Sequence, residues 1–358
     1  MSRPASRCGR PLRRVVVLVS CLVLLGALVW CWPGPVRAAG PRSGDAGLLS
    51  AIGGTDGFHR LSVAVVELDG TPRVRYASVG ADEHTRYEAG SVTKALTGLV
   101  IADEVRRGEL DLATPAGRLL PLGDGPASAV TLRQLVTHSS GLPSLDPGTA
   151  RTGGALALLG LDPYRAVDAD ELFAAAATTP TGDPAYAYSN LGAALAGQAA
   201  ARAAGTTYPE LLRSRLVEPL GLRETRLQTE DALVPSGRSE RGRRMQPWVN
   251  RGYAPAGCVV TTTADLATVA TALLERRAPG MAALEPLAPA GTTPGRRSGI
   301  FWQTSVHDGT TVTWHNGRTG GYSAFLGLDR AGGRGVVVLA DAATDRTDDL
   351  GMRLVTQS

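Results

Sequence analysis

Residues 87–97 read YEAGSVTKALT, and this stretch decides how the rest of the chain is interpreted. Ser91 and Lys94 stand three positions apart at the start of an apolar run. Residues three apart lie on the same face of a helix, so the hydroxyl of Ser91 and the amine of Lys94 can meet there. The pattern predicts a nucleophile beside a base, although a helix-capping serine followed by an exposed lysine would show the same spacing.

Lysine usage supports the catalytic interpretation. The chain has 37 basic side chains, and Lys94 is its only lysine. An arginine could supply a surface charge at this position, but it could not give up its proton near neutral pH, whereas a buried lysine can. A chain that otherwise uses arginine therefore kept the one cation that can act as a base.

Length and composition are those of a globular protein. The 358 residues suffice for one large domain or two small ones, and 43% hydrophobic and 20% charged residues exclude wholesale disorder. The net charge is +4, and five arginines precede residue 15, so the remaining chain is near neutral. We therefore expect no nucleic-acid partner.

The first 39 residues have the pattern of an export signal. The five arginines are followed by an uncharged apolar run at 15–32 and by small residues ending in a possible cut after Ala38. This pattern is typical of a signal peptide or of an uncleaved membrane anchor, and the letters LVSC at 18–21 also resemble a lipoprotein cleavage box. We expect an exported protein, either secreted or held at the outer face of the cytoplasmic membrane by this segment.

Cysteine usage excludes a disulfide framework. Three of the four cysteines lie in the leader, so Cys258 alone belongs to the exported part. No internal disulfide and no cysteine metal cluster can form there. We interpret Cys258, which stands in an apolar segment, as a buried small residue.

The pattern beyond the leader predicts an α+β fold. Residues 40–57 are rich in Gly, Pro, Ser and Asp and are interpreted as a linker, and residues 58–358 as one domain. Strands are predicted at both ends of this domain and helices between them, which indicates one antiparallel sheet formed from both chain ends with an inserted helical region. The predicted strands are 61–68, 73–79, 300–306, 310–315, 322–328 and 335–340; the predicted helices are 91–108, 131–138, 170–177, 190–204, 209–217, 264–276 and 347–355.

A second candidate motif is Tyr188-Ser189-Asn190, at the start of an alanine-rich predicted helix. A tyrosine whose pKa is lowered by nearby positive charge can act as acid or base toward a nucleophile and a leaving group. The amide of Asn190 offers a donor and an acceptor to a peptide-like substrate. A buried tyrosine followed by a helix cap is the simpler alternative.

A third candidate motif reads WHNGR at 314–318 and ends a predicted strand. His315 could hold a proton or position a carboxylate, and it would be partly charged at pH 7. Gly317 leaves room for an extended substrate beside the strand. A histidine without a functional role, at the end of a strand and followed by a turn, would show the same sequence pattern.

In this order, Ser-x-x-Lys, Tyr-x-Asn and His-x-Gly resemble the three motifs of the serine β-lactamase and penicillin-binding protein family. The second motif is similar to that of the class C β-lactamase branch and its D-Ala-D-Ala carboxypeptidase and esterase relatives. The stretches 131–143, 218–222 and 320–325 also fit, and the resemblance covers roughly residues 58–356. It implies a β-lactamase/transpeptidase-like fold.

The resemblance also implies a role for each motif. Ser91 would be acylated by a carbonyl group, Lys94 and Tyr188 would move the proton, and the backbone N–H groups of Ser91 and Arg318 would form the oxyanion hole. No metal or organic cofactor is implied. The catalytic residues would be Ser91, Lys94, Tyr188 and His315, and the substrate-binding residues would be Asn190, Gly317 and Arg318.

The implied protein is an exported active-site-serine hydrolase that acts through an acyl-enzyme on peptides of the D-Ala-D-Ala type, esters or β-lactams. His315 replaces the family's more usual lysine, and its weaker charge favours peptides or esters over antibiotics. The alternatives are a β-lactamase proper, a non-hydrolytic membrane-anchored penicillin sensor, and a peptide acyltransferase or cyclase. We expect a monomer with a small-molecule or peptide substrate.

Two other hydrolase classes lack their motifs. An α/β-hydrolase would need a G-x-S-x-G elbow, which does not occur. A zinc hydrolase would need H-E-x-x-H or clustered histidines, and the five histidines are scattered.

Overall fold

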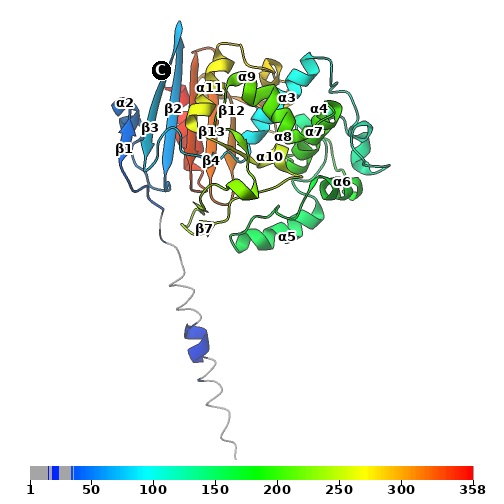
Figure 1. Ribbon diagram of the computed structural model, residues 1–358, viewed down its shortest axis with the longest axis horizontal. Coiled ribbons are helices and arrows are strands. Elements are labelled where there is room, and N and C mark those ends of the chain that lie inside the picture. Colours follow the sequence, from blue (N-terminus) through cyan, green and yellow to red (C-terminus); the bar gives the residue numbers. More distant parts are fainter. Residues whose placement is uncertain (1–14, 16–17, 24–33, 35, 358) are drawn as a thin grey trace, which may run out of the picture.

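One antiparallel sheet runs through the domain and is built by strands from both ends of the chain (Figure 1). The computed structural model describes Val15, residues 18–23, Gly34 and residues 36–357. Within that part, nine strands lie in the order β1-β3-β2-β14-β13-β12-β11-β10-β9. Their bounds are β1 Arg42–Gly44, β2 Leu61–Asp69, β3 Thr71–Val79, β9 Ala288–Pro289, β10 Arg297–Ser298, β11 Gln303–His307, β12 Thr310–Arg318, β13 Ser323–Asp329 and β14 Arg334–Ala340.

Local turns and one long-range pairing produce this order. The sequence Asp69-Gly70 lies at the junction of β2 and β3. Asp308 and Gly309, between β11 and β12, both have positive φ (49° and 82°), as a type I′ hairpin turn requires. The two chain ends meet where β2 pairs with β14, with Val63 opposite Val338. The predicted α+β fold, with one sheet from both ends, is confirmed.

The helices occupy the inserted region and the two chain ends. The predicted capping box is present: Thr131 Oγ1 accepts the N–H of Gln134 (3.3 Å), and Gln134 Oε1 accepts the N–H of Thr131 (2.9 Å). The pattern does not predict α5, because three glycines lower its helix propensity. The helices are α2 Ala46–Ile52, α3 Val92–Arg106, α4 Leu132–Val136, α5 Pro147–Leu158, α6 Ala169–Thr178, α7 Asn190–Ala203, α8 Tyr208–Leu212, α9 Glu218–Leu220, α10 Ala254–Gly257, α11 Thr263–Leu274 and α12 Arg346–Thr356.

The sheet separates two hydrophobic cores. Side chains alternate along β2, so Val63 packs with α2 and α12, whereas Ala64 packs with the larger core around α3 and α11. The inserted helices lie together on this second side (Figure 1). Cys258 is buried in the larger core, as predicted.

The prediction of a linker at 40–57 is wrong. Arg42–Gly44 form β1, which pairs with β3, and Asp45 caps α2 by accepting the N–H of Leu48 (2.7 Å). Leu48 and Ile52, one helical turn apart, are buried against the sheet. The Gly, Pro and Asp residues of this segment form the turn and the helix cap around β1 and α2. Both elements are held in place by packing against the sheet. The domain therefore begins before residue 58.

Most of the predicted leader, residues 1–39, lies outside the described residues. Residues 18–23 form a helical segment. Of the helices that the structure describes, none is long and apolar enough to cross a bilayer. The choice between a signal peptide and an anchor stays a prediction.

One small sheet supports the segment that leads to Ser91. In it, β4 (Tyr87–Glu88) pairs with β8 (Val259–Thr261), which also pairs with β5 (Arg226–Leu227). A further pair, β6 (Gly237–Arg238) with β7 (Arg244–Met245), forms a separate ribbon. The chain therefore reaches Ser91 directly from a paired strand.

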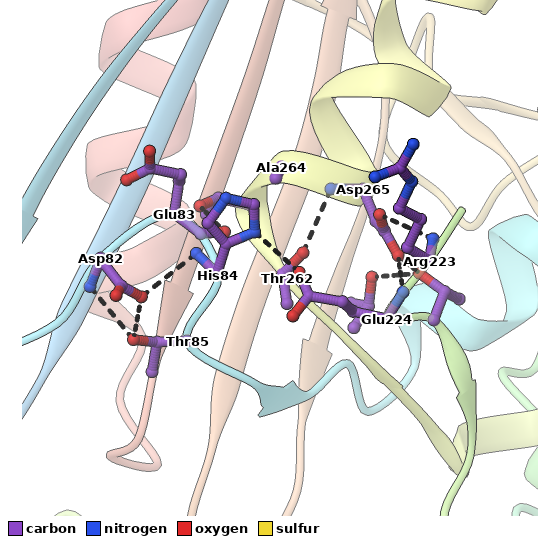
Figure 2. Close-up of polar contacts among 12 residues, drawn as sticks. Asp82, Glu83, His84, Thr85, Arg223, Glu224, Thr262, Ala264 and Asp265 are labelled. Atoms are coloured by element: carbon purple, nitrogen blue, oxygen red, sulfur yellow. Dashed lines mark hydrogen bonds and ion pairs between the residues drawn. The ribbon is translucent and has the colours of Figure 1, made fainter. Parts of the chain in front are cut away.

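Asp265, at the start of α11, holds the turn that precedes β5 (Figure 2). Its buried carboxylate accepts the backbone N–H groups of Arg223 (3.2 Å) and Glu224 (2.8 Å) and the hydroxyl of Thr225 (2.7 Å). These bonds replace the water that the carboxylate loses on burial. On the exposed side of the same turn, Glu224 pairs with His84 (2.9 Å), and this hydrogen bond raises the pKa of His84.

Candidate active site

Ser91 lies where β4 meets α3. Its backbone is already helical (φ −68°, ψ −7°), and its side chain does not cap the helix. The residue is partly exposed and lines a cavity, whereas the helix is buried from Val92 to Glu104. The hydroxyl is accessible, and the alternative of a helix-capping serine is excluded.

Lys94 is completely buried beside Ser91. Its Nζ lies 2.9 Å from Ser91 Oγ and 2.6 Å from the carbonyl oxygen of Ala256 in α10. Lys94 forms no ion pair within the described part of the chain, and burial holds its pKa well below the ordinary range. The amine donates N–H groups to the Ala256 carbonyl oxygen and to Ser91 Oγ, and in its neutral form it also has a lone pair that can accept the Ser91 proton. The alternative of an exposed lysine is excluded as well.

Tyr188 joins this pair in a different ionisation state from the predicted one. The Nζ of Lys94 lies 4.9 Å from the centre of the Tyr188 ring. Desolvation raises the pKa of Tyr188, although a hydrogen bond with Ser91 opposes the shift. The prediction of a lowered pKa is wrong because burial removes the water that would stabilise the phenolate of Tyr188. Tyr188 is therefore a neutral phenol that can both donate and accept a hydrogen bond.

His315 lies on β12 and is buried. Its Nδ1–H donates to the carbonyl oxygen of Asn316 (2.6 Å), so Nε2 carries the lone pair. Burial lowers the pKa of His315 to about 3. The prediction of a partly charged imidazole at pH 7 is wrong, because the packed strand and the nearby Tyr188 ring (centroids 6.5 Å apart) leave no water around it.

A second buried histidine, His138, completes this group and was not predicted. The N–H of Ser189 donates to its Nδ1 (3.2 Å), so its proton lies on Nε2. Its ring centre lies 4.6 Å from that of Tyr188. The backbone of His138 has a φ of +57°, which turns the chain back after α4. The only sequence signal was its place inside the stretch 131–143.

The end of β12 lies directly against the start of α3. A Cβ atom on Gly317 would lie 2.0 Å from the carbonyl oxygen of Ala89, and one on Gly90 would lie 2.7 Å from the nitrogen of Arg318. Side chains at these positions would overlap backbone atoms, so both must be glycine. The role predicted for Gly317 was space for substrate; in the structure that space is filled by the start of α3.

The backbone N–H of Arg318 points toward the contact between the end of β12 and the start of α3. Across the hairpin, Thr319 N–H donates to the carbonyl oxygen of Tyr322 (2.9 Å). Successive residues of a strand point their N–H groups to opposite edges, so that of Arg318 points away from β13. On that edge the pairing with β11 ends at Trp314. The N–H groups of Ser91 and Arg318 therefore lie close together at an open edge, as an oxyanion hole requires.

A cavity of about 90 Å³ opens beside Ser91. Asn190 and Arg318 line it, so two of the predicted substrate-binding residues lie there. The ring of Tyr164 lies 5.2 Å from that of Trp248 and 5.1 Å from that of Tyr253, which forms one aromatic wall. Isolated aromatic residues in connecting segments carry no signal in the sequence, so this wall was not predicted. The remaining lining residues are Gly90, Asn250, Ala256 and Gly257.

A larger cavity of about 1010 Å³ lies among α6, α7 and α8. Its lining contains none of the predicted catalytic residues. Volume therefore does not identify the site; the arrangement of Ser91 and Lys94 does.

Comparisons with known proteins identify the family and the fold of the chain. The Beta-lactamase family matches residues 50–356. The chain belongs to the beta-lactamase family. Among solved structures, a class C beta-lactamase from Rhodobacter sphaeroides superimposes with a TM-score of 0.69 at 19% identity, covering 83% of this chain and 93% of that one. The β-lactamase/transpeptidase-like fold implied by the motifs is confirmed.

Two curated relatives share shorter segments with this beta-lactamase-family chain. "Esterase EstB" of Burkholderia gladioli is 38% identical over 94 residues, which are 23% of this chain and 24% of that protein. "D-alanyl-D-alanine-carboxypeptidase/endopeptidase AmpH" of Escherichia coli K12 is 30% identical over 175 residues, 46% of this chain and 44% of that protein. The chain thus spans less than half the length of both relatives.

Lys94→Arg should abolish acyl transfer although the charge is kept. Arginine cannot accept the Ser91 proton, so we expect hydrolysis of a nitrophenyl ester to slow by at least about 10²-fold. In the wild type, the lowered pKa of the Lys94 amine should bring the rate to its plateau well below the ordinary lysine pKa near 10.4. A rate that keeps rising as far as that ordinary pKa, or a fully active variant, would contradict the role of Lys94.

Gly317→Ala should separate β12 from α3. The new methyl group would overlap the carbonyl oxygen of Ala89, so the strand must move and carry the N–H of Arg318 with it. We expect kcat to fall by about 10²-fold, the usual effect of losing one oxyanion donor. Gly154→Ala is the matched control, because nothing lies within 4 Å of that Cβ position. Equal kcat in the two variants would show that the close contact is not needed.

Proposed function

We propose that this member of the beta-lactamase family is an active-site-serine hydrolase. The observation that carries the proposal is the 2.9 Å approach of Lys94 Nζ to Ser91 Oγ, with the lysine fully buried. Burying a lysine costs free energy, and a buried lysine held neutral beside an accessible hydroxyl is an arrangement that activates a nucleophile.

In the proposed reaction, the Oγ of Ser91 attacks a carbonyl carbon while Lys94 accepts its proton. The N–H groups of Ser91 and Arg318 stabilise the negative charge that develops on the carbonyl oxygen. Tyr188 relays the proton from Lys94 to the departing alcohol or amine, and Asn190 binds the substrate amide. Water then attacks the acyl-enzyme, and the same groups take its proton and pass it to the Oγ of Ser91 as the acyl–oxygen bond breaks, which releases the acid product and restores Ser91 and neutral Lys94.

Neutral esters fit this site better than β-lactam antibiotics. His315 is uncharged at pH 7, so it adds no charge to hold the carboxylate that these antibiotics carry and that the end of a D-Ala-D-Ala peptide carries as well. The name of one relative, an esterase, supports the ester class, and the name of another, a D-alanyl-D-alanine carboxypeptidase/endopeptidase, supports the peptide class. We propose an ester or a peptide of the D-Ala-D-Ala type as the substrate.

A rate comparison on nitrocefin, a D-Ala-D-Ala peptide and a nitrophenyl ester tests the substrate class. We expect kcat/KM for the ester or the peptide to exceed that for nitrocefin by at least about tenfold. The highest value for nitrocefin would favour a β-lactamase proper. Covalent labelling without turnover of any of the three would favour a penicillin sensor.

Ser91→Ala tests the nucleophile. A fluorophosphonate probe should label the wild-type chain and leave the variant unlabelled, because alanine has no hydroxyl to attack phosphorus. Labelling is read by gel fluorescence, and circular dichroism shows whether the variant is folded. A folded Ser91→Ala chain that is still labelled would refute the assignment.

We further propose that the enzyme acts outside the cytoplasm, as a monomer, with residues 1–39 as its export signal or anchor. The arginines before the apolar run at 15–32 support this location. Immunoblots of cell fractions should find the chain in the medium or in washed membranes. Recovery in the cytosol alone would contradict export.

A further inference from the structure

Glu88 is a buried carboxylate that the proposed reaction does not use. It lies on β4, three residues before Ser91, and its residue is 3% exposed. Its Oε1 accepts the N–H of Trp248 (2.5 Å) and an Nε2–H of Gln228 (2.8 Å), and its Oε2 accepts the hydroxyl of Thr319 (2.5 Å). A carboxylate with no cationic partner in the described part of the chain is costly to bury, and burial raises the pKa of Glu88 to about 7.

On the Oε1 side, both partners can act only as donors to Glu88. The N–H of Trp248 is a backbone group. The Oε1 of Gln228 accepts the N–H of Val234 (2.9 Å), which orients the amide so that its nitrogen faces Glu88. A proton on this carboxylate oxygen would therefore meet two other protons.

On the Oε2 side, the direction of the bond is also determined. The Oγ1 of Thr319 accepts the N–H groups of Tyr322 (3.1 Å) and Gly321 (3.3 Å), so its own proton is left for Glu88. Three donors thus converge on Glu88. An ionised carboxylate satisfies all of them, whereas a protonated carboxyl or an amide would oppose at least one with a proton of its own.

These hydrogen bonds connect three sides of the candidate active site. Thr319 directly follows Arg318, whose N–H belongs to the proposed oxyanion hole, and Trp248 lines the cavity beside Ser91. We infer that Glu88 is a positioning residue, which holds the end of β12 and the aromatic wall in place relative to Ser91. This inference rests on the proposed function, since an oxyanion hole matters only if Ser91 is acylated.

The experiment compares two near-isosteric variants, Glu88→Gln and Thr319→Val, by ester hydrolysis and by the rate of fluorophosphonate labelling. A misplaced oxyanion donor weakens transition-state binding and leaves ground-state binding intact. We therefore expect kcat to fall by about 10- to 100-fold in each, with KM changed by less than about twofold. Both substitutions remove the same hydrogen bond, the one between the Thr319 hydroxyl and Glu88. The double variant should therefore be no slower than the slower of the two single variants. Thr319→Ser, which keeps the hydroxyl, should restore most of the rate.

Asp265→Asn is the matched control. Asp265 is also a buried carboxylate that accepts three donors, among them the backbone N–H groups of Arg223 and Glu224 (Figure 2). It does not line the cavity beside Ser91. Its variant should unfold at a lower urea concentration and keep the wild-type kcat.

Wild-type kcat in Glu88→Gln, independent losses in the double variant, or Thr319→Ser as slow as Thr319→Val would each overturn the inference. If Glu88→Gln does not fold, the comparison of kcat between Thr319→Val and Thr319→Ser tests the inference by itself. If the probe labels Ser91 of the wild type and the Glu88 and Thr319 variants react at the wild-type rate, only the role of Glu88 is refuted. A wild-type chain that is not labelled at Ser91 would refute the proposed function itself.

Discussion

The neutral state of Lys94 depends on the exclusion of water, and the packing around α3 provides it. Desolvation is the cause that lowers the pKa of this lysine. The helix is buried from Val92 to Glu104, so it needs cover on every side, and the sheet, α7 and α10 supply it. The carbonyl oxygen of Ala256 in α10 accepts a hydrogen bond from the amine without adding a charge. A looser core would admit water, and Lys94 would then bind a proton and lose its use as a base.

A second constraint is the direct contact between backbone segments at the start of α3. Gly90 and Gly317 leave no room for side chains there, which brings the N–H groups of Ser91 and Arg318 together. Strand β12 pairs with β13 from Val312 to Arg318 but with β11 only as far as Trp314. The end of the strand is thus held by the sheet while its open edge remains available to a substrate. The buried carboxylate of Glu88 adds a bond to the residue after Arg318.

Local patterns predicted much of the fold and several candidate site residues that the structure brings together. Spacing of three on a helix is enough to place Lys94 beside Ser91, and hairpin turns such as Asp308-Gly309 follow from residue preferences. Protonation states could not be predicted in this way. Tyr188 and His315 were assigned the behaviour of side chains near water or charge, whereas both are desolvated. The segment 40–57 was misjudged for the same reason, because its order comes from burial against a distant strand.

The sequence by itself determined which chemical groups are present and which of them are neighbours along one element. The single lysine, the serine three residues before it and the order of the three motifs are properties of short segments. Only the tertiary structure decided which groups are neutral and which distant groups meet. Glu88 and Thr319, 231 residues apart, become hydrogen-bonded because β4 and β12 pack against the same helix start. Burial and long-range pairing depend on the whole chain, so no short stretch of sequence contains them.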